Sequence, residues 1–147
     1  MAARNILVVP TDFSSRSLTA LPWVRKVAEM MQADVRCIYV VEEPQIYSTL
    51  DMGPIAVPSV TELVKSAEEH LDSFIKSNLG AFGSPPKAAV LVGGPAEEIV
   101  RYAKDNDATM IIMTTHGYSG VRHLLLGSTT EGVLRHATCP VLSIRAA

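Results

Sequence analysis

Near its start the sequence reads Ile6-Leu7-Val8-Val9-Pro10-Thr11-Asp12-Phe13-Ser14. Its first four residues are apolar without alternation, which is typical of a strand covered on both faces of a sheet. Pro10 cannot donate a hydrogen bond to a neighbouring strand, so the strand is expected to end there. We therefore predict a buried strand over residues 5–10 that brings Asp12 to the carboxyl edge of a sheet.

Four similar apolar runs follow, and helical patterns separate them. The further strands are predicted at residues 34–41, 87–92, 109–114 and 140–145. One helical stripe contains Leu18, Leu21, Val24, Ala28 and Met31, and a second contains Val60, Leu63, Val64, Ala67, Leu71, Phe74 and Ile75. Shorter helices are expected from Pro95 to about residue 105 and from Ser128 to about residue 136. This alternation predicts an α/β fold with an open, parallel five-stranded sheet and helices on both faces.

The predicted helix starts carry recognisable capping signals. Ser59 with Glu62, and Ser128 with Glu131, have the spacing of a reciprocal capping box. Pro95 suits the first position of a helix. Between the second strand and the second helical stripe, residues 42–58 contain three prolines and a glycine without sustained periodicity. Connections of this length are often functional or mobile, so we expect a mobile element there.

Composition bounds the possible functions. The 147 residues are 48% hydrophobic, which indicates a single globular domain over residues 1–147. The net charge of -2 and the lack of a Lys/Arg-rich run argue against a nucleic-acid partner. No apolar run approaches the roughly 20 residues of a membrane-spanning helix, so no membrane partner is expected. Cys37 and Cys139 lie far apart, and the absence of paired cysteines fits a cytoplasmic protein with inert thiols.

A glycine-rich stretch follows the fourth predicted strand. It reads Thr114-Thr115-His116-Gly117-Tyr118-Ser119-Gly120 and leads through residues 121–126 to Gly127-Ser128-Thr129-Thr130. Glycines permit close approach of a ligand, and the N-terminus of the following helix offers unpaired N–H groups, so an anion such as phosphate would be stabilised there. Alternatively, the glycines only turn the chain and Ser128 only caps its helix.

Asp12 is the second candidate. At the carboxyl edge of the sheet it can accept hydrogen bonds from a ribose hydroxyl or a base amino group, although Asp12 and Ser14 could instead only cap the following helix. Ligands of open α/β sheets bind where the strand order reverses. The pattern alone leaves strand order open; with the order 3-2-1-4-5, strands one and four would flank that crevice.

These residues together resemble the universal stress protein family, in particular its nucleotide-binding branch. The resemblance covers essentially the whole chain and rests on residues 6–14, on Gly93-Gly94-Pro95-Ala96-Glu97-Glu98-Ile99, and on the block from Gly127-Ser128 to Pro140-Val141-Leu142. It implies a Rossmann-like sheet of order 3-2-1-4-5, similar to adenine nucleotide alpha hydrolases. It also implies a homodimer formed through the last strand, residues 140–145.

The family's ATP signature is a glycine, two residues, a second glycine, nine residues, and then glycine with Ser or Thr. Gly117 and Gly127-Ser128 match its later parts, whereas Thr114 replaces the first glycine. A threonine hydroxyl could still bond the sugar. The resemblance implies that Pro10, Thr11, Asp12 and Val40 contact adenine or ribose, that Met113 and Thr114 line the sugar, and that Gly117, Gly127, Ser128, Thr129 and Thr130 hold phosphates. Mg²⁺ or Mn²⁺ would arrive with the nucleotide.

The predicted function is a cytoplasmic, ATP-binding regulator or sensor of the stress response, with slow or no hydrolysis. AMP or another adenine nucleotide remains an alternative ligand. No Walker lysine, paired carboxylates or nucleophile elbow is present, so the sequence indicates no efficient catalytic machinery. His116 and His123 lack metal-ligand spacing, and Arg122 could reach a terminal phosphate. The rival predictions are a weak ATPase and a dimer of the same family that binds a protein partner without nucleotide.

Overall fold

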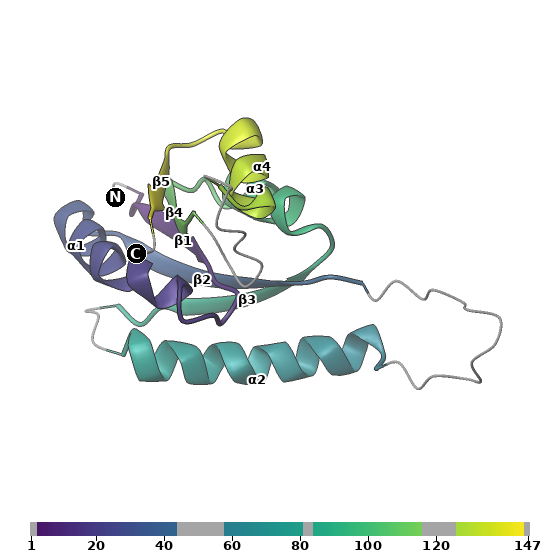
Figure 1. Ribbon diagram of the computed structural model, residues 1–147. Helices are drawn as coiled ribbons and strands as arrows, with labels where there is room; N and C mark the ends of the chain where they lie inside the picture. Colours follow the sequence, from purple (N-terminus) through teal and green to yellow (C-terminus); the bar gives the residue numbers. More distant parts are fainter. Residues whose placement is uncertain (1–2, 44–57, 81–83, 116–125, 146–147) are drawn as a thin grey trace, which may run out of the picture.

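The chain folds as a parallel sheet of five strands in the order β3-β2-β1-β4-β5 (Figure 1). The computed structural model describes residues 3–43, 58–80, 84–115 and 126–145. The strands are β1 (Ile6–Pro10), β2 (Asp34–Val41), β3 (Lys87–Val92), β4 (Met110–Thr114) and β5 (Val141–Ile144). All four strand pairings are parallel. The predicted fold class and strand order are therefore confirmed.

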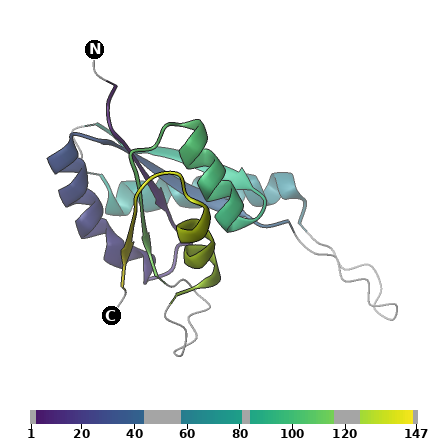
Figure 2. The ribbon, with the colours of Figure 1, turned by 90° about the horizontal axis from the view of Figure 1, so that it is seen from above.

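Helices cover both faces of this sheet. They are the short 3-10 helix η1 (Ser17–Ala20) and the α-helices α1 (Leu21–Met31), α2 (Val60–Asn78), α3 (Pro95–Asp105) and α4 (Ser128–His136). Successive strand residues point to opposite faces, which places Leu7 and Val9 in a cluster with α1 and Val8 in a cluster with α3 and α4. A third cluster joins α2 to β2. Seen from above in Figure 2, α3 and α4 lie over the sheet and α2 runs beneath it.

The first helical stripe differs from its prediction at the start. Leu18 lies in η1 and is 39% exposed, whereas Val24 and Ala28 of α1 are buried. Pro22 lies in the first turn of α1. A proline fits there because the first-turn N–H groups have no partner within the helix, and the α-helix accordingly begins at Leu21, after Leu18. The apolar stripe on the sheet therefore begins at Leu21.

The predicted helix at 128–136 is confirmed as α4, but only two of the three predicted capping signals are. Ser59 accepts a hydrogen bond from the Glu62 N–H at 3.2 Å, and the Glu62 carboxylate accepts the Ser59 N–H at 3.3 Å. Pro95 is the first residue of α3. The predicted capping box of Ser128 is wrong, because Gly127 holds the N-cap position with φ −70° and ψ 158°. Ser128 is thus already helical, one position too late for its side chain to cap.

Some predicted features lie outside the described residues. These are Gly117, His116, Arg122, His123 and most of the connection over residues 42–58. In the described part of the chain, no helix combines the length and the apolar character needed to cross a membrane.

Candidate functional site

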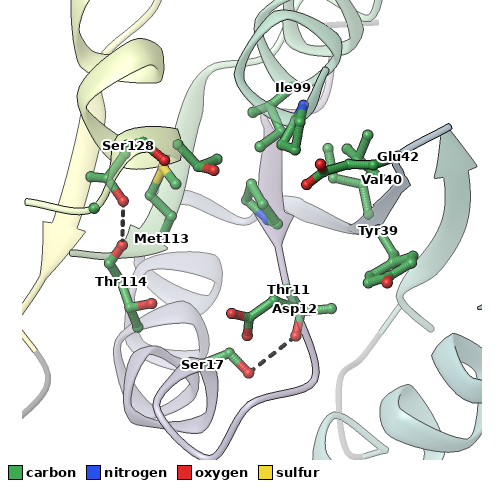
Figure 3. A pocket seen from close by; sticks show the side chains of 16 residues that line it. Thr11, Asp12, Ser17, Tyr39, Val40, Glu42, Ile99, Met113, Thr114 and Ser128 are labelled. Atoms are coloured by element: carbon green, nitrogen blue, oxygen red, sulfur yellow. Dashed lines mark hydrogen bonds between the residues drawn. The ribbon is translucent and has the colours of Figure 1, made fainter. Parts of the chain in front are cut away.

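A pocket of about 360 Å³ opens at the carboxyl ends of β1, β2 and β4 and at the start of α4 (Figure 3). It lies where the strand order reverses between β1 and β4, the position at which open α/β sheets hold their ligands. Every predicted site residue in the described part of the chain lines this pocket: Pro10, Thr11, Asp12, Val40, Met113, Thr114, Gly127, Ser128, Thr129 and Thr130. The described parts of the two segments singled out in the sequence are therefore neighbours in space.

The corner after β1 is held by its own hydrogen bonds. The Thr11 N–H donates to the Ile38 carbonyl at 2.9 Å, which continues the pairing of β1 with β2 beyond Pro10. The Thr11 hydroxyl donates to Ser17 Oγ at 3.1 Å, and both side chains are buried. Asp12 Oδ1 accepts the Ser14 N–H at 2.9 Å. The Asp12 carboxylate thus bonds the local turn and also lines the pocket. It does not occupy the N-cap of the following helix η1, which is Arg16.

The opposite wall is the start of α4. The Gly127 N–H donates to the Thr115 carbonyl at 2.7 Å, and the Thr130 hydroxyl donates to the Thr114 carbonyl at 2.8 Å. These two bonds tie the first turn of α4 to the end of β4. The backbone N–H groups of a first turn have no acceptor within their own helix and carry the positive end of its dipole. This wall is therefore suited to an anion.

The side facing β2 and α3 is mainly apolar. Ile38, Val40, Pro95 and Ile99 line it, and Ile38 and Ile99 are almost fully buried. Such a surface favours a flat, apolar group such as a nucleobase. The pocket therefore has an apolar side and an anion-binding side, with polar groups between them.

The charged side chains among the described residues that line the pocket all have one sign. Asp12 and Glu42 are carboxylates, and no Lys, Arg or His belongs to the described residues that line it. Figure 3 shows the Glu42 carboxylate directed inward from the β2 side. An anionic ligand would need its charge balanced by backbone N–H groups, hydroxyls and a cation that it brings with it.

Six lining residues were not predicted. They are Ser17, Ile38, Tyr39, Glu42, Pro95 and Ile99. The rule that singled out Asp12, a polar residue just after a strand, applies equally to Glu42 after β2 and could have found it. Ser17 reaches the pocket through its bond with Thr11, a contact that the sequence pattern does not reveal.

Comparison with known proteins agrees with this geometry. The family model described as "Universal stress protein family" matches residues 3–145. The chain belongs to the universal stress protein family. Two curated members from Methanocaldococcus jannaschii are similar over 95% of this chain. MJ0531 is 33% identical with 81% of its length covered, and MJ0577 is 30% identical with 93% covered.

Solved structures of the family share the fold. A structure of MJ0577 matches with a TM-score of 0.78 at 31% identity, covering 98% of this chain and 97% of that one. The universal stress protein UspA from Lactobacillus plantarum matches with a TM-score of 0.77 at 25% identity, covering 99% and 100%. The parallel sheet and its flanking helices are therefore those of other universal stress proteins.

The two cysteines of this universal stress protein are not among the residues that line the pocket. Cys37 is fully buried in β2, and burial raises the pKa of its thiol to about 12. Burial also raises the pKa of Cys139. Both shifts favour the unreactive thiol over the thiolate. Among the described residues, no group of three His, Cys, Asp or Glu side chains could hold a metal ion.

Proposed function

We propose that this universal stress protein binds an adenine nucleotide, with ATP as the first candidate, in the pocket between β1 and β4. Nucleotide occupancy would regulate the response to stress, with slow or no hydrolysis. The observation that carries the proposal is the convergence on one cavity of the predicted site residues that the structure describes. Its volume of about 360 Å³ lies within the range of small-molecule sites.

The chemistry of each side suggests how the nucleotide would lie. Phosphates would bind at the N-terminus of α4, where first-turn N–H groups lack helical acceptors and Ser128 and Thr129 line the pocket. The base would lie on the apolar side, against Val40 and Ile99. Asp12 would accept a hydrogen bond from a ribose hydroxyl or a base amino group. Thr114 lines the cavity in place of the first signature glycine, where its hydroxyl would bond the sugar.

A divalent cation belongs to the proposal because of the pocket's charge. Asp12 and Glu42 supply negative charge, and the described lining supplies no basic side chain. Mg²⁺ or Mn²⁺ held by the phosphates would neutralise part of the ligand's charge. The same lack of basic groups among the described residues favours binding over turnover, since phosphoryl transfer depends on positioned positive charge.

Other members of the fold are described with related ligands. One universal stress protein structure is titled as a complex with cAMP, at 20% identity and a TM-score of 0.71. Another, from Archaeoglobus fulgidus, is titled as a complex with dAMP, at 23% identity and a TM-score of 0.65. At these identities they share the fold with this chain, and the proposal rests on the pocket residues of the chain itself.

We also propose that residues 1–147 form one domain that dimerises through β5. This strand is at one edge of the sheet and pairs with β4 on its inner side. An edge strand exposes backbone donors and acceptors that a second copy can pair with. The cytoplasm is the proposed location, since Cys37 and Cys139 are free thiols.

Mass spectrometry of the small molecules released from purified protein tests the proposal. Intact ATP or another adenine nucleotide, present in proportion to protein, would support it. Steady release of ADP from added ATP would instead favour a weak ATPase. Failure to bind any adenine nucleotide, before or after adding it with Mg²⁺, would favour the partner-binding alternative.

A further inference from the structure

Phe13 has an unusual backbone for its residue type. Its φ is +63°, in the left-handed region that bulky residues rarely adopt. It directly follows Asp12, at the corner between β1 and η1. A conformation of this kind persists only where the surrounding contacts enforce it, and it is concentrated at functional sites.

Aromatic rings from two other elements enclose the Phe13 side chain. Its ring stacks on Tyr39 of β2, with centroids 4.6 Å apart and planes 21° from parallel. Phe74 of α2 meets it edge-on at 5.8 Å, and the His70 ring lies 5.9 Å away. Stacked and edge-to-face pairs at these distances are attractive beyond the area that they bury. Phe13 is therefore fixed from the sheet side and from the helix side.

Tyr39 connects this cluster to the pocket. It stacks on Phe13 and also lines the cavity, next to Val40 (Figure 3). Helix α2 itself contributes no residue to the described pocket lining. The rings of Phe74, Phe13 and Tyr39 thus connect α2 to the binding site by direct contacts.

The Phe13 backbone also sets one of the hydrogen bonds of the corner. The Phe13 N–H donates to Thr11 Oγ1 at 3.1 Å, and the next N–H, of Ser14, donates to Asp12 Oδ1 at 2.9 Å. The Ser14 bond depends on the Phe13 conformation, because the φ and ψ of Phe13 set where the Ser14 N–H lies relative to the Asp12 carboxylate. If the Phe13 ring were free to leave its place, the left-handed conformation would lose its support and the Asp12 carboxylate would lose its orientation.

We propose that Phe13 is a positioning residue: its ring, held between Tyr39 and Phe74, keeps the 11–14 corner in the shape that directs Asp12 at the ligand. The inference builds on the proposed nucleotide site. An aromatic cluster, of which only Tyr39 lines the pocket, would thus control how well the nucleoside part of the ligand is recognised.

The experiment compares four variants by calorimetry with ATP-Mg²⁺ and with inorganic tripolyphosphate. Phe13→Leu keeps apolar bulk without a ring, Phe13→Gly accepts the left-handed backbone without a ring, and Phe13→Tyr keeps the ring. Tyr102→Leu is the matched control, because it removes a partly buried aromatic ring from a different cluster. We expect Phe13→Leu and Phe13→Gly to lose about tenfold in ATP affinity, as loss of an aromatic pair predicts, with less than about twofold change for tripolyphosphate.

Phe13→Tyr and Tyr102→Leu should keep the wild-type ratio of the two affinities. An equal loss for both ligands, or no loss in either ring-free variant, would overturn the positioning role. A wild-type protein that binds no ATP would refute the proposed function, so amide hydrogen exchange without nucleotide gives the second readout. The Ser14 amide should exchange about tenfold faster in Phe13→Leu than in Tyr102→Leu. Equal exchange at Ser14 would overturn the inference whatever the nucleotide result.

Discussion

A methyl group added at Gly132 tests the packing that forms one wall of the pocket. A Cβ atom at this position of α4 would lie 2.7 Å from the Cβ of Ala96 in α3, whereas ordinary contact begins at 3.4 Å. Helices α3 and α4 would have to separate by about 0.7 Å to reach ordinary contact. Overpacking of this kind costs about 1–3 kcal/mol, and the better helix propensity of alanine returns about 1 kcal/mol. We therefore expect Gly132→Ala to lower the free energy of unfolding by about 1 kcal/mol.

Urea unfolding of Gly132→Ala, Ala96→Gly and the double variant measures this effect. In the double variant the added methyl group occupies the space that Ala96 has vacated. Its loss of unfolding free energy should therefore be smaller than the summed losses of the two single variants by about 1–2 kcal/mol. Nucleotide affinity should fall in Gly132→Ala and recover in the double variant, because α3 and α4 both line the pocket. An additive double variant, or a Gly132→Ala protein more stable than wild type, would refute this description of the α3–α4 contact.

Three further predictions concern single side chains. Asp12→Ala should weaken ATP binding by about tenfold and tripolyphosphate binding far less, as loss of a charged hydrogen bond predicts; calorimetry showing an unchanged ratio would contradict its role. Thr130→Val should lower the free energy of unfolding by about 1 kcal/mol by removing the bond to the Thr114 carbonyl, and Thr130→Ser should keep most of it in urea titrations. Burial raises the pKa of Cys37 to about 12 in the folded state. The protonated thiol therefore stabilises the fold fully below the unfolded pKa near 9, and this stabilisation is lost as the pH rises toward 12. Between pH 9 and 12, the free energy of unfolding should fall by up to about 1.4 kcal/mol per pH unit more in wild type than in Cys37→Val. Parallel curves of unfolding free energy against pH would show that burial does not protect the thiol.

Much of the fold was predictable because its signals are local. The buried strands are continuous apolar runs, and β2 and β3 have the predicted bounds, Asp34–Val41 and Lys87–Val92. Helix α3 begins at Pro95 because proline suits only the first turn. The Ser128 capping box was wrong because the Ser-x-x-Glu pattern is also satisfied one position inside a helix whose N-cap is glycine.

The candidate site was predictable where residues follow strand ends or match a family motif. Asp12 follows β1, Gly127 and Ser128 match the motif, and Glu42 after β2 could have joined this group. The role of Phe13 was not predictable, because its ring partner Phe74 lies 61 residues along the chain and only tertiary packing brings the two together. Its left-handed backbone is likewise imposed by these contacts, since nothing in the residue type favours it.

The most direct test of the central claim is calorimetric titration of the nucleotide-free protein with ATP-Mg²⁺, alongside variants at Gly127. The φ and ψ of Gly127 are open to any residue, so Gly127→Gln adds bulk alone and Gly127→Glu adds bulk with negative charge at the start of α4. The account predicts saturable one-to-one binding to wild type. It also predicts that the Gly127→Glu variant binds ATP at least about a hundredfold more weakly than Gly127→Gln, because the added carboxylate and the phosphates would lie within a few ångströms of each other. Equal affinities for Glu and Gln, or no binding to wild type, would contradict the claim that phosphates lie at this helix terminus.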